Sequence, residues 1–152
     1  MESLFIDPEA RHRIYLRDLP VPRLEGSEDW VEVYAELPYG VAVAVEREGL
    51  RARMLLSSSD ARGAEIPLEL DLLAARRALL VHAILDWSLA DKDGRKVPVG
   101  TVEERRRAIE RLPDWLVRAL MDAVDSYYAS RRLDAKNRPA GAAFREGAEG
   151  AG

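Results

Sequence analysis

Apolar residues in the second half of the chain recur every three or four positions, as they do on one face of an α-helix. In a final predicted helix, opened by Pro113, these residues are Leu116, Val117, Leu120, Met121, Val124, Tyr127 and Tyr128. A wider apolar stripe over residues 67–89 predicts a central helix and consists of Leu72, Leu73, Leu79, Leu80, Ala83, Ile84 and Trp87. Between the two, Thr101 and Glu104 have the capping-box spacing that predicts a short helix ending near Leu112.

The first half of the chain has a less regular pattern. Residues 30–37 partly alternate apolar and acidic side chains, which predicts a half-exposed strand whose partner is a short strand over residues 13–16. Pro38 and Gly40 then end this strand. Residues 41–56 fit two descriptions, because their valines favour a strand whereas their length, alanines and Glu/Arg content favour a helix. We favour the helix and keep a second strand as the alternative.

These patterns together predict a mainly α protein: a small domain of about four helices with a short N-terminal β element and a disordered C-terminal tail. We interpret residues 1–29 as an extended arm, because Pro20 and Pro22 cannot continue a helix or a central strand. The helical core domain is expected over residues 30–133. Alanine, glycine and charged residues dominate residues 134–152, which predicts a flexible tail.

Composition narrows the class of protein. A chain of 152 residues with 47% hydrophobic and 33% charged residues is typical of one soluble domain, and it contains no cysteine for a disulfide or a thiolate ligand. The net charge of −4 argues against a broad phosphate-binding surface. Glu103, Glu104 and Glu110 surround the densest basic run, residues 105–107, so we interpret this run as a solvated helix face, with a nucleic-acid contact as the alternative. We expect neither a nucleic-acid nor a membrane partner.

Candidate catalytic and metal-binding residues are few. Asp91 to Gly94 resembles part of a calcium loop, but no carboxylate stands at the first or the twelfth position, so we expect a surface turn. His12 and His82 are the only histidines, which excludes a multi-histidine metal site. His82 and Asp86, one helical turn apart, have the spacing of a hydrogen-bonded dyad, but no nucleophile completes it. We therefore expect no enzyme activity, no cofactor and no metal.

Aromatic residues are the candidates for partner binding, because they dominate both protein cores and binding hot spots. The candidates are Trp30, Tyr39, Trp87, Trp115, Tyr127 and Tyr128. For Trp87 and Trp115 the alternative is that they close the helical core. Trp30, at a strand end near Tyr39, is the best candidate for an exposed contact.

Two stretches of the chain together resemble the tail assembly chaperones of long-tailed bacteriophages. Residues 30–40, Trp-Val-Glu-Val-Tyr-Ala-Glu-Leu-Pro-Tyr-Gly, are similar to the family's Trp, hydrophobic, Glu, hydrophobic pattern that leads into a Leu-x-Tyr-Gly helix start. Residues 86–99 carry Asp-Trp, Asp-Gly and Val-Pro, and Leu112-Pro113 follows, which matches the order and rough spacing of the family's landmarks. The resemblance covers about residues 29–130. Pro38 and Val41 depart from it, because threonine and a charged residue are more usual at these places.

The resemblance implies a mainly helical protein, without enzyme activity, in the cytoplasm of a bacterial host. Its partner would be the phage tape measure protein, which it keeps soluble during tail assembly by covering the apolar faces of long helices. The tail tube protein, or a second copy of the chain, is a further possible partner. The alternative function is that of a virion structural accessory protein, from the tail or the capsid, that is retained in the particle.

Overall fold

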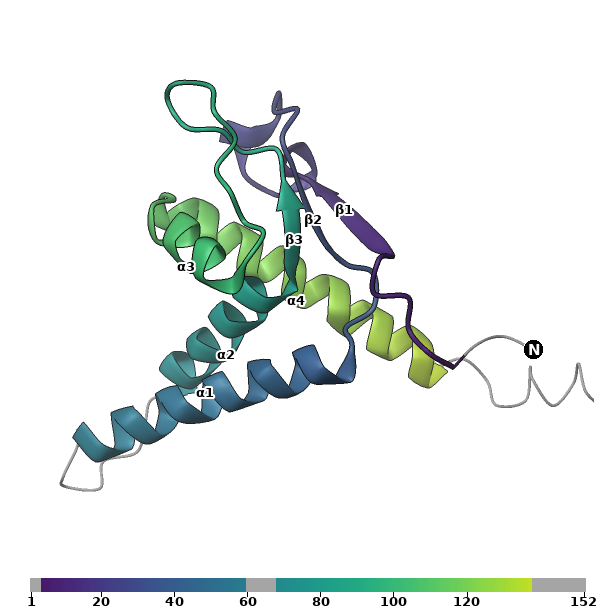
Figure 1. Cartoon of the computed structure of the whole chain (residues 1–152), viewed down its shortest axis with the longest axis vertical. Coiled ribbons are helices and arrows are strands. Elements are labelled where there is room, and N and C mark those ends of the chain that lie inside the picture. The colour runs from purple at the N-terminus through teal and green to yellow at the C-terminus, as the bar shows by residue number, and fades with distance from the viewer. Residues whose placement is uncertain (1–3, 60–67, 138–152) are drawn as a thin grey trace, which may run out of the picture.

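The computed structural model describes residues 4–59 and 68–137. Within these ranges the chain forms four α-helices and a three-stranded antiparallel sheet, which agrees with the mainly α fold predicted from the sequence (Figure 1). In chain order the elements are β1 (Arg11–Tyr15), the 3-10 turns η1 (Leu16–Asp18) and η2 (Pro22–Leu24), β2 (Trp30–Tyr34), α1 (Tyr39–Ser59), α2 (Leu68–Ala83), β3 (Ile84–Trp87), α3 (Val102–Glu110) and α4 (Asp114–Asn137).

The sheet has the order β1-β2-β3. The predicted pairing between the strands over residues 13–16 and 30–37 is confirmed, with bounds that differ by a few residues, because β1 and β2 run antiparallel along their whole length. The third strand was not predicted. It lies on the other side of β2, with Trp87 opposite Val31.

The helix predicted over residues 67–89 is wrong in its last part, since α2 ends at Ala83 and the chain continues directly as β3. The apolar residues of this part fit a helical stripe and a buried strand equally well. In the sheet, Ile84 lies opposite Val33, and Trp87 is only 1% exposed. Strand pairing therefore buries the same side chains that a longer helix would have buried.

The end of α2 is capped by Arg105, which comes from α3. Its Nε donates to the carbonyl oxygen of Val99 at 2.8 Å, and its Nη1 donates to the carbonyl oxygens of Val81 and His82 at 3.4 and 3.5 Å. The last carbonyls of a helix lack donors within the helix, so these bonds satisfy groups that the turn into β3 leaves open. Arg105 is only 8% exposed, which shows that the prediction of a solvated face for residues 105–107 is wrong for its first residue.

The ambiguous segment over residues 41–56 is a helix, and the strand alternative is wrong. Helix α1 begins just after Pro38, whose carbonyl oxygen accepts hydrogen bonds from the amides of Val41 and Ala42, both at 3.0 Å. Proline has no amide to donate, but its carbonyl can accept the first bonds of a helix. The structure thus agrees with the prediction made from the length, the alanines and the Glu/Arg content of this segment.

The hydrophobic core lies between the sheet and the helices that cover one of its faces (Figure 1). Val31 and Val33 of β2, both 0% exposed, belong to the same cluster as Leu80 of α2 and Leu120 of α4. Because side chains alternate along a strand, the neighbours of these valines in β2 point away from the core.

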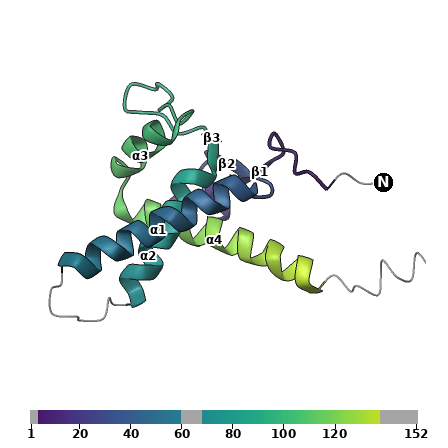
Figure 2. The same cartoon turned by 60° about the horizontal axis from the view of Figure 1, so that its bottom comes forward.

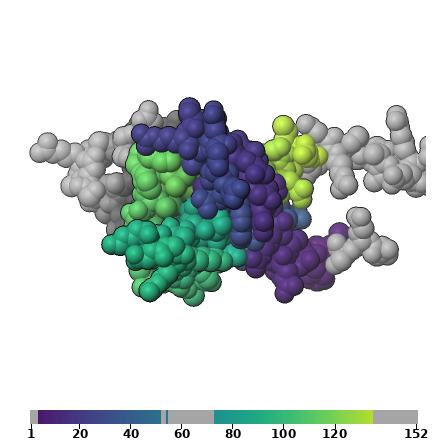
Figure 3. Space-filling view, turned by 90° about the horizontal axis from the view of Figure 1, so that it is seen from above, coloured from purple at the N-terminus to yellow at the C-terminus, as the bar shows by residue number. Residues whose placement is uncertain are grey.

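The segment expected to be an extended arm, residues 1–29, contributes to this core. Leu16, Leu19 and Leu24 are buried and belong to the main cluster. In the space-filling view of Figure 3, the purple residues of this segment lie against the green helices. The arm interpretation therefore does not hold for residues 11–24.

The C-terminal boundary also differs from the prediction. Helix α4 continues to Asn137, so the first residues of the predicted flexible tail, residues 134–137, are helical. The rest of the predicted tail, residues 138–152, lies outside the described residues.

Candidate functional site

Helix α1 is apolar but poorly covered. It runs antiparallel beside α2, and the two helices project from the body of the domain (Figures 1 and 2). Every residue from Val41 to Val45 is partly exposed, and none of the α1 side chains that the structure describes is buried. Farther along, Leu50 and Met54 are 57% and 64% exposed. Aliphatic side chains are usually the most buried in a domain, so α1 carries an apolar surface that the described residues leave partly exposed.

A polar cluster ties α1 to the rest of the domain. The Glu48 carboxylate lies 2.9 Å from Nε2 of His82 on α2, and it forms an ion pair with Arg106 on α3. Apart from this carboxylate, α1 has its main contact with α2, where Gly49 lies close to the backbone of Ala75. One side chain thus connects α1 to two other helices.

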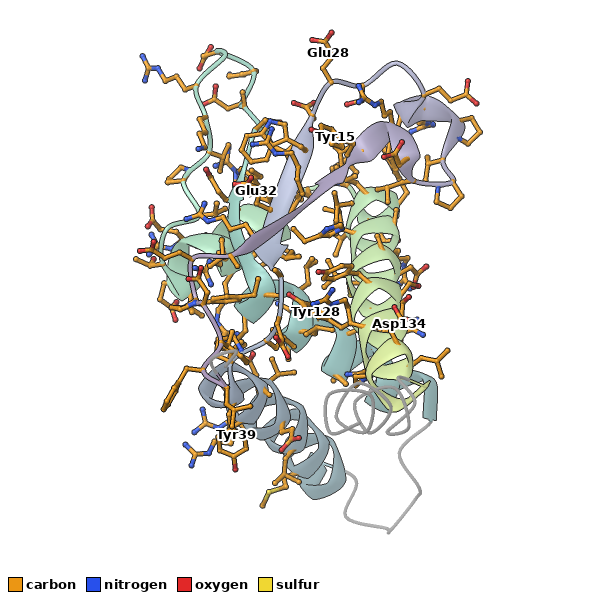
Figure 4. All side chains as sticks on the ribbon, turned by 90° about the vertical axis from the view of Figure 1, so that its right-hand side faces the viewer. Tyr15, Glu28, Glu32, Tyr39, Tyr128 and Asp134 are labelled. Carbon is orange, nitrogen blue, oxygen red and sulfur yellow. The ribbon has the colours of Figure 1, made fainter. Side chains whose placement is uncertain are left out.

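A groove of about 720 Å³ lies between the start of α1 and the last turns of α4. Its lining consists of Ala35, Glu36, Leu37, Ala42, Tyr128, Arg131, Arg132 and Asp134. Figure 4 looks into this side of the molecule, with Tyr128 between Tyr39 at the start of α1 and Asp134 near the end of α4. Ala35, Leu37, Ala42 and Tyr128 are buried or half-buried and form the floor, whereas the four charged residues are exposed and form the rim. An apolar floor with a polar rim is typical of surfaces that bind other proteins.

Two tyrosines of α4 fix one wall of this groove. The hydroxyl of Tyr128 donates to the carbonyl oxygen of Tyr34 at 2.6 Å, and that of Tyr127 donates to the carbonyl oxygen of Ala35 at 2.7 Å. Burial raises the pKa of the Tyr128 phenol, so this group stays protonated and remains a donor. The Tyr127 ring stacks on His12 with ring centroids 3.9 Å apart. The chain segment after β2 is therefore held firmly against α4.

Two arginines at the rim of the groove are available for new ion pairs. In the described part of the chain, neither Arg131 nor Arg132 forms an ion pair, although Arg131 helps burial to lower the pKa of His12. A second hollow, of about 340 Å³, lies between α2, α3 and α4. There the rim charges already form pairs, for example Arg77 with Glu110 at 3.2 Å. The first groove is thus the larger of the two and the better able to form new ionic contacts.

The predicted partner-binding aromatics fall into two groups. Trp87 and Tyr128 are buried, at 1% and 4% exposure, so neither ring stands out from the surface, although the edge of Tyr128 lines the groove and its prediction as a partner contact stays untested. For Trp87 the alternative of a core residue is correct, and its Nε1 donates to the carbonyl oxygen of Val97 at 2.8 Å.

The remaining aromatics keep some exposure. Tyr39 is 83% exposed at the start of α1, near the groove. Trp30 is half-buried under the guanidinium of Arg13, and Trp115 is half-buried with Arg23 above its ring. These two tryptophans lie outside the groove, so the structure does not bring the predicted aromatics together into one site.

The structure separates the predicted His82–Asp86 dyad. Because Asp86 belongs to β3, its carboxylate pairs with Lys96 at 2.6 Å, while His82 faces Glu48. Partial burial opposes ionisation of Asp86, but the hydrogen bond from Lys96 prevails and lowers the pKa of this carboxyl. The two groups therefore cannot act together as an acid and a base.

The Asp91–Gly94 segment forms a turn. The carboxylate of Asp91 accepts hydrogen bonds from the amides of Asp93 and Arg95 at 2.9 and 3.0 Å, and Gly94 has a φ of 78°. A positive φ of this size favours glycine. Among the described residues, no group of three or more His, Asp or Glu side chains has an arrangement that could hold a metal ion.

No protein-family model, no curated protein and no solved structure matches this chain. No helix in the described ranges has the length and apolar character needed to cross a membrane. The groove, the partly exposed apolar residues of α1 and the sequence landmarks are therefore the features that bear on function.

Proposed function

We propose that this chain is a tail assembly chaperone of a long-tailed phage, which binds the tape measure protein and keeps it soluble until the tail is assembled. The sequence landmarks over about residues 29–130 support the family. The observation that carries a binding role is the groove beside α1, a helix whose apolar residues 41–45 are all partly exposed among the described residues.

An amphipathic helix of the partner suits this groove. Its apolar face would lie over Leu37, Ala42 and the exposed edge of Tyr128, and its flanking polar residues would meet the charged rim. Covering this apolar surface removes it from water, and the same contact hides the apolar face of the partner helix, which would otherwise aggregate. A shallow groove with few buried anchors gives modest affinity, as release to the tail tube requires.

The test is co-expression of the chain with the tape measure protein of the same phage, followed by measurement of the soluble fraction of that protein. We expect the wild-type chain to raise this fraction. The Ala42→Arg variant, which places a long charged side chain into the groove, should lose most of the effect. Ala90→Arg, at an exposed position after β3, is the matched control and should retain it.

The possible results separate the function from the site. If the wild-type chain leaves the tape measure protein insoluble, the proposed function is wrong. If Ala42→Arg works as well as Ala90→Arg, the function stands but the groove is not the binding site. Mass spectrometry of purified virions tests the alternative function, because a retained structural subunit should be present in stoichiometric amount, whereas a chaperone should be absent.

A further inference from the structure

A second surface lies on the opposite side of the sheet from the core, at β1 and the start of β2. It consists of Arg11, Arg13, Tyr15, Arg17, Trp30 and Glu32, and is called the arginine face below. The side chains of Arg11 and Arg13 are 43% and 41% exposed. Figure 4 shows Tyr15 and Glu32 on the adjoining strands β1 and β2. This surface is separate from the groove beside α1.

Aromatic rings hold the arginines of this face in place. The guanidinium of Arg13 lies 3.9 Å from the centre of the Trp30 ring, and that of Arg17 lies 4.7 Å from the centre of the Tyr15 ring. Stacking of this kind stabilises the cation and limits its rotamers before any partner arrives. A ligand would therefore lose less side-chain entropy on binding than it would with free arginines.

The arginine face carries unused positive charge in a chain whose net charge is −4. Its one carboxylate, Glu32, accepts hydrogen bonds from Arg11 at 3.3 Å and from Arg13 at 3.1 and 3.2 Å. Each guanidinium has five N–H donors, so both arginines keep donors for another acceptor. Arg17 has no ion pair with any described residue. The charge of Arg11 also acts on Asp86, which lies opposite Glu32 on β3 and pairs with Lys96 at 2.6 Å. The three arginines and Lys96 thus face two carboxylates, which leaves an excess of positive charge.

The backbone of β1 has an unpaired edge next to the arginine face. Strand β1 is an edge strand, and no described strand pairs with its outer side (Figure 1). The amide of Leu16 donates to Asp29, and the carbonyl of Ala10 accepts from Ala35, so the even-numbered residues between them make the bonds to β2. In an antiparallel pair the alternate residues direct their backbone groups the other way. The donors and acceptors of Arg11, Arg13 and Tyr15 therefore point to the open edge.

We propose that the arginine face and the edge of β1 bind an extended, acidic segment of a protein partner, which adds as a further strand. Its backbone pairs with β1, and its carboxylates reach Arg11, Arg13 and Arg17 from the same side of the sheet. Charge selects this occupant: a second copy of β1 would place arginines opposite arginines, and like charges across a strand pair are destabilising. The proposal does not depend on the groove or on the identity of the helical partner.

A short synthetic peptide that alternates glutamate with threonine is a suitable probe. We expect saturable binding by calorimetry that weakens as the NaCl concentration rises, with amide chemical shift changes centred on β1. Arg11→Gln/Arg17→Gln should weaken binding about fivefold, given the usual strength of exposed ion pairs. Arg95→Gln/Arg107→Gln changes the net charge equally at exposed sites elsewhere and should have no effect.

Two further peptides make the test specific. A lysine–threonine peptide should not bind. A glutamate–threonine peptide that is N-methylated on the residues facing β1 should bind much more weakly, because it cannot donate to the strand edge. Absence of saturable binding by the first peptide, or equal losses in both double variants, overturns the proposal. Equal binding of the N-methylated peptide overturns strand addition.

Discussion

Replacing Arg105 is the sharpest test of how the sheet and the helices are joined. Its guanidinium is buried, forms no ion pair with a described carboxylate, and donates to three carbonyl oxygens, two of which lie at the end of α2. In the Arg105→Ala variant, these carbonyls lose their donor inside the protein and a cavity replaces the side chain. The carbonyl oxygen of Val99, bonded at 2.8 Å, should contribute most of the loss.

The expected magnitude follows from the three bonds. A hydrogen bond from a charged donor contributes about 1.5–3 kcal/mol, and the bonds at 3.4 and 3.5 Å are long enough to contribute less. Removing the side chain also removes the unfavourable burial of its charge, an effect that lowers the pKa of Arg105. We therefore expect Arg105→Ala to lower the free energy of unfolding by about 2–4 kcal/mol.

Urea denaturation followed by far-UV circular dichroism measures this loss. The midpoint should fall by about 1–2 M, given the usual slopes for a domain of this size. Arg107→Ala, at an exposed position on the same helix, is the control and should stay within about 0.5 kcal/mol of the wild type. Arg105→Met separates capping from packing, because it fills the space without donating. A loss below about 0.5 kcal/mol for Arg105→Ala would refute the capping argument.

Two further predictions concern the groove and α1. Tyr128→Phe removes the hydroxyl that donates to Tyr34 at 2.6 Å and should cost about 1 kcal/mol in the same denaturation assay. Because the folded pKa of Tyr128 is raised above its unfolded value near 10, wild-type stability should be complete below about pH 10 and fall as the pH rises, and the variant should lack this component of the fall. His82→Ala should speed amide hydrogen exchange in α1 but not in α4, because it removes the contact between His82 and Glu48. An exchange rate in α1 that is the same in the variant as in the wild type would contradict this role.

The sequence predicted those elements whose pattern is local. The helix after Pro113 and the capped helix after Thr101 follow from helical spacing and end signals, and Thr101 accepts the hydrogen bond from the Glu104 amide at 3.1 Å as the capping box requires. Strand β3 escaped prediction because its four residues, Ile84 to Trp87, continue the stripe of α2. Only pairing with β2, far away in the sequence, decides between helix and strand there.

The groove could not be predicted from the sequence, for a similar reason. Its lining comes from the segment after β2, the start of α1 and the end of α4, and the bond that joins the first of these to α4, from Tyr127 to Ala35, spans 92 positions. One local signal did exist. Residues 41–45 place apolar side chains all around the helix instead of on one stripe, which a helix at the edge of a small domain cannot bury without a partner. A prediction of the binding surface from the aromatic residues alone does not detect this signal, because most of the described aromatic side chains are at least half-buried and lie elsewhere.

The α4 side and the α1 side of the groove are held by different contacts, and this difference bears on release of a partner. On the α4 side, two tyrosine hydroxyls bind the segment after β2, whereas α1 depends on its packing against α2 and on the Glu48 cluster. We therefore expect a partner that needs a wider groove to displace α1 before α4. Such a displacement would lower the affinity, since part of the binding free energy would be spent on repositioning α1. Movement of α1 would help a chaperone that must release its partner during assembly, whereas a permanent structural subunit would not need it.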